Sequence, residues 1–202
     1  MLDTAADNLH GVLLAAGASR RFGSPKALAK FGAQTLLERA ISTAQAVLGD
    51  RFTVILGANA AVIRPALSLP DRQVASHDGW RAGLSSTLRF GLAQVPAASP
   101  AALIMLLDQP AVGVAELQSL IDAWRERPSI AAAAWYADDP GAPCILPRAL
   151  FEAAATLQGD RGAKTLLQTL PQVSRVLMTV AAFDVDTPED LLRAAGLVRL
   201  SH

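Results

Sequence analysis

The chain has 202 residues, of which 51% are hydrophobic and 18% are charged, and its 18 basic residues balance its 18 acidic ones. This composition supplies material for a large apolar core and excludes an intrinsically disordered chain. The charge balance also excludes a generally basic surface for nucleic acid or for an anionic membrane, so any phosphate binding must be local.

We expect a cytoplasmic protein that contacts neither a membrane nor nucleic acid. The first nine residues carry Asp3 and Asp7, and they lack the positive start and the apolar centre of a signal peptide. No apolar run reaches the roughly 18 residues of a membrane span. Cys144 is the only cysteine and lies in an apolar stretch, which predicts a buried side chain without a disulfide partner.

Short apolar runs alternate with segments of helical periodicity in the first two thirds of the chain. The expected strands, buried on both faces, are residues 12–15, 52–56, 102–107 and 130–135. The expected helices between them are residues 35–48, 83–94 and 114–125. This alternation is typical of crossover units, and it predicts an α/β fold with a mainly parallel sheet flanked by helices.

The last third is punctuated by prolines and glycines and is less regular. Its expected strands are residues 144–146, 174–179 and 183–185, and its expected helices are residues 148–157 and 163–169. Thr187, Pro188 and Asp190 then predict the start of a final helix, with Thr187 as the N-cap and Asp190 three residues beyond it. Because no linker or repeat is visible, we expect residues 1–202 to form one domain.

The first candidate site is the loop at residues 15–26, which reads Ala-Ala-Gly-Ala-Ser-Arg-Arg-Phe-Gly-Ser-Pro-Lys directly after the first strand. Small residues allow main-chain N–H groups to approach an anion closely. Arg21 and Lys26 would then neutralise charge on a triphosphate. The spacing matches neither the dinucleotide fingerprint nor the P-loop. An ordinary turn with solvated basic residues is the simplest alternative, which the combined pattern disfavours.

Carboxylates follow two of the expected strands. Asp108 comes just after the strand at residues 102–107, where open α/β sheets bind their ligands. Asp184 and Asp186 lie at the end of the expected strand at residues 183–185, and in an extended chain they fall on the same face. Mg²⁺ sites usually combine one or two carboxylates with substrate oxygens. We predict Asp108 and Asp186 as magnesium ligands, although a turn-forming or helix-capping role remains open for each, and Asp184 is an alternative to Asp186.

A further candidate is the segment at residues 78–87, which reads Asp-Gly-Trp-Arg-Ala-Gly-Leu-Ser-Ser-Thr. Hydroxyls at a helix N-terminus are ordinary caps, but the same position also suits a phosphate or a base-contacting loop. The three histidines are scattered and give no metal-ligand spacing, and no Gly-x-Ser-x-Gly nucleophile elbow is present.

Five motifs together resemble the nucleotidyltransferases that modify the molybdenum cofactor, in that family's order, over about residues 9–197. They are Leu14-Ala15-Ala16-Gly17 with Ser19, Arg21, Gly23 and Lys26; Trp80, Gly83, Ser85 and Ser86; Leu107-Asp108-Gln109-Pro110; Gly159-Asp160 with Gly162-Ala163-Lys164; and Asp184 with Asp186-Thr187-Pro188-Glu189-Asp190. The chain is most similar to the cytidylyltransferase branch, since the guanylyltransferase branch usually has Gly at the position of Ala16 and lacks the Asp-Gln-Pro and Ser-Ser elements.

The resemblance implies a three-layer α/β/α Rossmann-like nucleotidyltransferase fold with a donor-binding half at about residues 9–110 and an acceptor-binding half at about residues 111–200. It implies CTP as donor, Mg²⁺ as cofactor and the molybdenum-pterin cofactor as acceptor, with a molybdoenzyme or its chaperone as a further partner. The implied nucleotide-binding residues are Leu14, Ala15, Ala16, Gly17, Ala18, Gly57, Gly83, Ser85 and Ser86, and the implied acceptor-binding residues are Gly141, Asp160 and Gly162.

The implied reaction is attack by the terminal phosphate of the pterin on the α-phosphorus of CTP. A phosphate nucleophile is already ionised at neutral pH, so positioning and charge neutralisation by Arg21 and Lys26 should dominate. The chain departs from many relatives at Phe22, Thr87, Ala142 and Lys164, and the last two lie in the half that should contact the acceptor. A cytidylyltransferase for a sugar or polyol phosphate and a non-catalytic carrier of the molybdenum cofactor therefore remain as alternatives.

Overall fold

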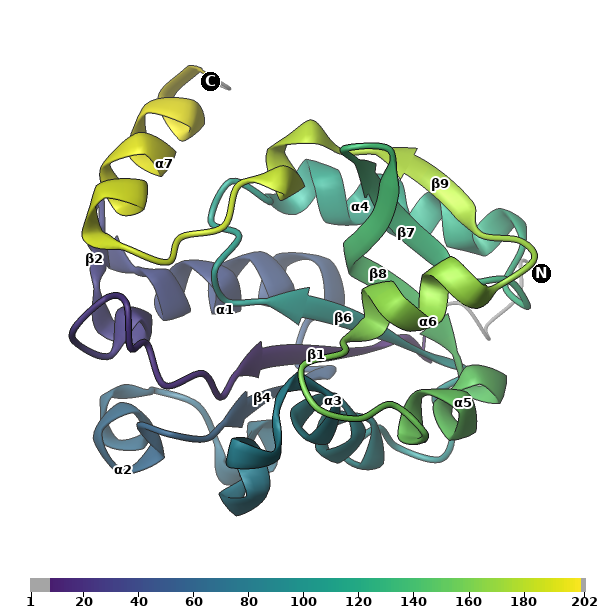
Figure 1. The fold of residues 1–202 in the computed structure, drawn as a ribbon, viewed down its shortest axis with the longest axis horizontal. Coiled ribbons are helices and arrows are strands. Elements are labelled where there is room, and N and C mark those ends of the chain that lie inside the picture. The colour runs from purple at the N-terminus through teal and green to yellow at the C-terminus, as the bar shows by residue number, and fades with distance from the viewer. Residues whose placement is uncertain (1–7, 201–202) are drawn as a thin grey trace.

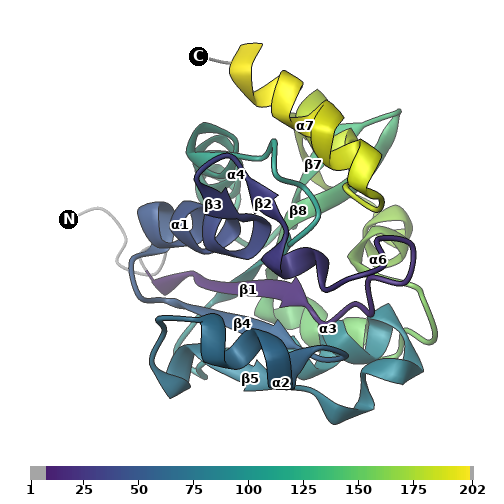
Figure 2. The ribbon, with the colours of Figure 1, turned by 90° about the vertical axis from the view of Figure 1, so that its left-hand side faces the viewer.

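The computed structural model describes residues 8–200, which form a seven-stranded sheet with helices on both faces (Figures 1 and 2). The strands are β1 His10–Ala15, β2 Lys30–Phe31, β3 Gln34–Thr35, β4 Phe52–Leu56, β5 Val74–Ser76, β6 Ala101–Leu106, β7 Ala132–Tyr136, β8 Asp139–Pro147 and β9 Ser174–Leu177. The α-helices are α1 Leu36–Leu48, α2 Ala60–Ile63, α3 Leu84–Ala93, α4 Val114–Glu126, α5 Phe151–Ala155, α6 Ala163–Thr169 and α7 Pro188–Leu200. Short 3₁₀ turns connect several of them.

The strand order in the large sheet is β5-β4-β1-β6-β8-β7-β9, and β2 pairs with β3 in a separate small ribbon. All neighbours in the large sheet are parallel except that β8 runs antiparallel to both β6 and β7. The expected mainly parallel, mixed α/β fold is confirmed. Because β1 and β6 are parallel neighbours, with Leu14 beside Leu106, their carboxyl ends lie together at one edge of the sheet.

Two apolar layers cover the sheet, one on each face. Side chains of α1 and α4 pack on the face that carries Leu13 and Met105. Side chains of α3, α5 and α6 pack on the opposite face, which carries Val12 and Ile104. Figure 2 shows α1 and α4 on one side of β1 and α3 on the other. This alternation along fully buried strands is the reason that the strands read as continuous apolar runs in the sequence.

Local capping explains where two helices begin. At α1, the Thr35 hydroxyl accepts a hydrogen bond from the Glu38 N–H at 3.1 Å, while the Glu38 carboxylate accepts one from the Thr35 N–H at 2.6 Å. At α7, Thr187 and Asp190 form the same reciprocal pair, at 3.2 and 3.0 Å. The predicted start of the final helix is therefore confirmed, and each cap satisfies N–H groups that lack partners within the helix.

Most predicted elements match the observed ones within two residues, with three exceptions in the last third of the chain. The strand predicted at residues 144–146 extends over Asp139–Pro147. The helix predicted at residues 148–157 begins as a 3₁₀ turn and continues as α5, which ends at Ala155. The strand predicted at residues 183–185 is wrong, because this segment follows a 3₁₀ turn and pairs with no strand. Within residues 8–200, no helix combines the length and the apolar character needed to cross a membrane.

Candidate nucleotide site

A cavity of about 600 Å³ opens where the carboxyl ends of β1 and β6 meet the start of α3. Its lining consists of Leu14, Ala15, Ala16, Gly17, Ala18, Arg20, Lys26, Trp80, Arg81, Gly83, Leu84, Thr87, Leu106, Leu107, Asp108 and Asp160. The volume falls in the range of pockets that hold small molecules and cofactors, and the position is where open α/β sheets bind ligands. All five residues predicted between positions 14 and 18 therefore lie at this cavity.

The loop after β1 is folded around Ser19. Its carbonyl accepts hydrogen bonds from the N–H groups of Phe22 and Gly23 at 3.1 and 3.2 Å, and its hydroxyl accepts one from the Lys26 N–H at 3.1 Å. Ser19 has a positive φ of 53°, which few residues other than glycine adopt. Gly17 is exposed, and the space beside its Cα is empty within 4 Å. The loop thus presents an open stretch of main chain to the cavity, as an anion site requires.

Lys26 lies at the centre of a charged network formed by distant parts of the chain. Its Nζ donates to Asp108 Oδ2 at 2.8 Å and to the Val185 carbonyl at 3.0 Å, and it lies 3.4 Å from Asp186 Oδ1. Only 10% of its side chain is exposed, so water screens these contacts weakly. Arg21 extends the network, with Nη2 2.8 Å from Asp186 Oδ2.

The two predicted cations differ in their surroundings. The Arg21 side chain is 73% exposed and does not line the cavity, whereas its neighbour Arg20 does. The sequence pattern singled out Arg21 and missed Arg20, because both residues are basic and only the fold of the loop decides which one faces the cavity. The main chain at Lys26 is held by the 3₁₀ turn that begins at this residue, directly after Pro25.

The carboxylates approach the loop from two directions. Asp108 follows β6 by two residues and lies on the same side of the sheet as Gly17, as predicted. Asp184 and Asp186 lie on an irregular segment rather than on a strand, and the Val185 N–H donates to the Asp108 carbonyl at 2.8 Å. Partial burial raises the pKa of Asp184 to about 6, and the negative charges of Asp108 and Asp186 add to the rise.

The donor set suits a hard divalent cation that is completed by substrate oxygens. Asp108 and Asp186 both contact the same Lys26 ammonium group, so their oxygen atoms converge on one point. Among the described residues, no group of three or more His, Cys, Asp or Glu side chains is arranged to hold a metal ion by itself. One or two carboxylates with phosphate oxygens is the usual composition of a Mg²⁺ site in a phosphoryl-transfer enzyme.

The wall opposite the loop is formed by the start of α3 and the segment before it. Gly83 precedes α3 and has a φ of 98°. Leu84 and Thr87, in the first turn of α3, line the cavity. Trp80 lies at the cavity with the Arg81 guanidinium 4.6 Å from the centre of its ring. Trp80, Arg81 and Thr87 belong to the candidate segment at residues 78–87, but they were not singled out as nucleotide-binding residues. Helical spacing from Gly83 could have identified Thr87, whereas the position of Arg81 depends on the preceding 3₁₀ turn.

Three predicted nucleotide-binding residues lie outside the cavity lining. Ser85 and Ser86 are buried, and the Ser86 hydroxyl contacts His77 Nε2 at 2.8 Å and the Gly79 carbonyl at 3.3 Å. In this structure Ser86 therefore holds the 3₁₀ turn before α3, and its contact with a nucleotide stays a prediction. At Gly57, an added Cβ would lie 2.7 Å from the Ala16 Cβ, so this glycine supports Ala16 from behind.

The predicted acceptor residues separate into two places. Asp160 lines the nucleotide cavity, and the Gly159 carbonyl accepts a hydrogen bond from the Ser85 N–H at 3.0 Å. Gly162 packs against Leu84 of the same wall. Gly141 lies apart from them in β8, where an added Cβ would be 2.1 Å from the Tyr136 hydroxyl. The acceptor residues thus do not form one separate pocket.

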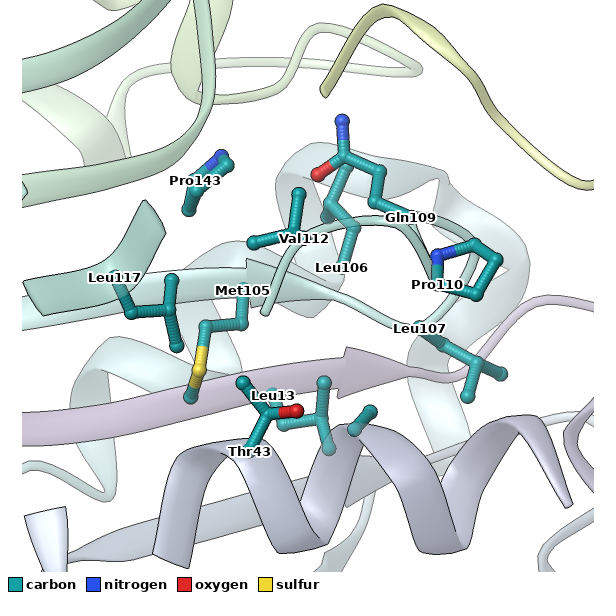
Figure 3. Close-up of a pocket in the computed structure, with 11 residues that line it drawn as sticks. Leu13, Thr43, Met105, Leu106, Leu107, Gln109, Pro110, Val112, Leu117 and Pro143 are labelled. Atoms are coloured by element: carbon teal, nitrogen blue, oxygen red, sulfur yellow. The ribbon is translucent and has the colours of Figure 1, made fainter. Parts of the chain in front are cut away.

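A second, much smaller void of about 20 Å³ lies beneath the loop at residues 107–110 (Figure 3). Leu13, Met105, Leu117 and Val112 surround it, and its volume suffices for about one water molecule. In Figure 3 the Gln109 side chain points away from these apolar groups. This void is a packing feature of the core.

A model of the MobA-like NTP transferase domain matches residues 11–176 of the chain. Among curated proteins, the chain is similar to Nicotine blue oxidoreductase of Paenarthrobacter nicotinovorans, at 33% identity over 96% of this chain and 99% of that protein. The similarity therefore extends over both halves of the chain and includes a relative whose name denotes redox chemistry.

Solved structures support the same relationship. Rv0371c from Mycobacterium tuberculosis H37Rv is similar with a TM-score of 0.81 and 31% identity, over 93% of this chain and 98% of that one. A manganese complex of Rv0371c gives a TM-score of 0.78 at 29% identity, over 94% and 98% of the two chains. Molybdopterin-guanine dinucleotide biosynthesis protein A from Archaeoglobus fulgidus shares the fold, with a TM-score of 0.73 at 16% identity over 95% and 99%.

Proposed function

Because the chain belongs to the MobA-like NTP transferase family, we propose that it transfers CMP from CTP to the terminal phosphate of the molybdenum-pterin cofactor and releases pyrophosphate. The observation that carries this proposal is the contact of Lys26 with Asp108 and Asp186 beside the 600 Å³ cavity. A buried cation between two carboxylates, next to an open main-chain loop, is suited to a polyphosphate and its metal ion.

The residues of the chain account for the reaction by position and charge. The main chain around Gly17 and Ala18 faces the cavity and would bind the β- and γ-phosphates. Lys26 would neutralise the negative charge that develops on the departing pyrophosphate, with Arg21 at the more exposed side. Asp108 and Asp186 would hold Mg²⁺, which supplies charge neutralisation across the phosphates when it is bound. No general base is needed, because a phosphate nucleophile is ionised at neutral pH.

Two features favour a pyrimidine base. Ala16 is buried at the floor of the cavity and packs on Gly57, so its methyl group narrows the space next to β1. The Thr87 hydroxyl is a polar group on the opposite wall. One methyl group discriminates by only about 1–3 kcal/mol, so polar contacts to the base would have to add to it.

The proposal covers the whole chain as one cytoplasmic nucleotidyltransferase domain, with the donor-binding half at about residues 9–110 and the acceptor-binding half at about residues 111–200. Asp160 would contact the acceptor from the rim of the nucleotide cavity, and Gly141 would act through Tyr136. A molybdoenzyme or its chaperone would receive the product. A cytidylyltransferase for a sugar or polyol phosphate would use the same donor site with a different acceptor.

A second candidate is an oxidoreductase, which the full-length similarity to Nicotine blue oxidoreductase favours. The charged groups of the cavity would then bind the phosphates of a nicotinamide dinucleotide instead of a triphosphate. The two candidates differ in what they consume. A transferase releases pyrophosphate only when an acceptor is present, whereas an oxidoreductase changes the absorbance of the nicotinamide.

The test is incubation of the purified protein with α-labelled CTP, Mg²⁺ and a panel of acceptors that includes the molybdenum-pterin cofactor, its metal-free pterin and methylerythritol phosphate. We expect label in the molybdenum-pterin product together with one pyrophosphate per transfer. Label found only in a polyol phosphate would mean that CTP is the donor and that a polyol phosphate, not the molybdenum-pterin cofactor, is the acceptor. Binding of the cofactor without pyrophosphate release would indicate a carrier. In a parallel incubation with a reduced nicotinamide dinucleotide and nicotine blue as electron acceptor, oxidation of the nicotinamide would indicate the oxidoreductase.

A further inference from the structure

Gln109 has a bonding pattern that the proposed reaction does not explain. Its side chain is buried, with 5% of the residue exposed. Nε2 donates to the Ala181 carbonyl at 2.7 Å and to the Ala142 carbonyl at 3.1 Å. A primary amide has two N–H donors. Here both donate to main-chain carbonyls, those of residues 142 and 181, which lie 39 residues apart in the sequence. Gln109 therefore connects the loop after β6 with β8 and with the turn before Asp184.

The segment that Gln109 contacts has no strand ladder. Residues 179–187, the carboxylate segment, pair with no strand and carry both Asp184 and Asp186. The side chains of Ala181 and Val185 are buried in the core. Besides the Gln109 bond, the polar contacts toward the loop and Asp108 are the Val185 N–H to the Asp108 carbonyl at 2.8 Å, Lys26 Nζ to the Val185 carbonyl at 3.0 Å, and the ion pairs of Asp186 with Lys26 and Arg21 at 3.4 and 2.8 Å. A segment without a strand ladder depends for its position on such individual contacts and on this packing.

The surroundings of the amide favour a neutral group with two donors. Gln109 lies beside Tyr136 and Asp184, and burial raises the pKa of Tyr136, with the charge of Asp184 adding to the rise. A carboxylate at this position would face two carbonyl oxygens and the negative charge of Asp184. An apolar side chain of the same length would fill the space and leave both carbonyls without a partner.

We propose that Gln109 is a positioning residue, whose side-chain amide sets the place of the carboxylate segment relative to Asp108. The proposal rests on the proposed function, in which Asp108 and Asp186 hold the divalent metal ion together. Gln109 itself does not line the nucleotide cavity. Its effect is to keep carboxylates from two distant parts of the chain directed at one point, as groups behind metal ligands commonly do.

The chain offers a matched control in Gln73. This residue is also buried, with 3% exposed, and its Nε2 donates to the Asp50 carbonyl at 3.0 Å. Gln73 precedes β5, where the chain enters the sheet, and does not line the nucleotide cavity. Gln73→Met thus removes a buried amide of the same kind without altering the carboxylate segment, and it reports the purely structural cost of such a change.

The experiment compares wild type, Gln109→Met, Gln109→Asn and Gln73→Met. The first readout is amide hydrogen exchange of the metal-free proteins, measured on peptides that cover residues 179–187. We expect both Gln109 variants to exchange faster in this segment, because neither side chain can bond both carbonyls, whereas Gln73→Met should match wild type there. Gln109→Asn keeps a polar amide, so it provides a soluble variant if Gln109→Met does not fold.

The second readout is Mn²⁺ binding in the presence of a non-hydrolysable CTP analogue, followed by electron paramagnetic resonance. We expect the Gln109 variants to raise the Kd for Mn²⁺ by a factor of about 10–100, the usual effect of removing a group behind a metal ligand, and Gln73→Met to leave the Kd unchanged. Exchange and Mn²⁺ affinity equal to wild type in both Gln109 variants would overturn the proposal. A wild-type protein that binds no Mn²⁺ would contradict the proposed function, while the exchange data would still decide the role of Gln109.

Discussion

The loop after β1 and the carboxylate segment contribute to the same charged network, but they are built differently. The loop continues a strand that is buried between two others, and its shape is set by hydrogen bonds to Ser19 within a few residues. The carboxylate segment is irregular and is placed by contacts from Lys26, Asp108 and Gln109, more than 70 residues away. Local sequence therefore determines the first region, and tertiary contacts determine the second.

This difference predicts that the loop should be sensitive to loss of charge, and that the carboxylate segment should be sensitive to loss of contacts. The largest expected effect is that of Lys26→Ala. We expect turnover to fall by a factor on the order of 10² or more, because the pyrophosphate loses a buried cationic partner. Pyrophosphate release by the purified variant measures the effect, with Lys30→Ala, an exposed lysine in β2, as the control. Near-normal release by Lys26→Ala would remove this residue from the mechanism.

Neutralising the carboxylates should have the next largest effect. Asp108→Asn and Asp186→Asn should each weaken Mn²⁺ binding and lower kcat by about 10- to 100-fold, because each change replaces a negatively charged carboxylate ligand by a neutral amide. We expect the larger loss for Asp108, which follows a buried strand directly. The exposed Asp122→Asn in α4 serves as control. Full metal affinity in both site variants would show that the carboxylates have only a structural role.

A smaller effect is expected at Ala16. Ala16→Gly should raise the ratio of kcat/KM for GTP to that for CTP by about five- to tenfold, as expected for roughly 1 kcal/mol from one methyl group. The variant is compared with Ala15→Gly, which changes the preceding residue, the last one of β1. An unchanged ratio would show that the Ala16 methyl group only packs against Gly57 and does not restrict the base.

The smallest effect concerns pH. The folded-state pKa of Asp184, about 6, is higher than its ordinary value of 3.8, so the folded protein is favoured while this group is protonated. Its contribution to stability is therefore complete at low pH and is lost as the pH rises from about 4 to 6. Asp184→Asn should be more stable than wild type above pH 6, by about 1 kcal/mol or less, because the Asp184 side chain is only partly buried and solvent screens its charge. Urea unfolding at pH 4 and pH 7.5 tests this, and an equal difference at both values would contradict it.

The sequence predicted every strand of the large sheet except β5, the longer helices and the cavity loop, because apolar periodicity and small residues after a strand reflect local geometry. It also placed Asp108 correctly from the end of β6. It failed at residues 183–185, where Phe183 and Val185 suggested a strand although the segment is held by contacts with distant residues that have no local signature. The bond between the Ser86 hydroxyl and His77 also could not be predicted, since only the fold of the preceding turn brings them together. The nucleotide-binding role of Ser86 stays a prediction.

The selectivity of the wild-type protein for its nucleotide tests the central claim most directly. We propose to measure kcat/KM for CTP and for GTP by pyrophosphate release, with Mg²⁺ and the molybdenum-pterin cofactor present at saturating concentration. We predict a preference for CTP of at least about tenfold, which corresponds to roughly 1.4 kcal/mol of selective binding in the transition state. Equal use of both nucleotides, or release of pyrophosphate from neither, would contradict the assignment of this cavity to CTP.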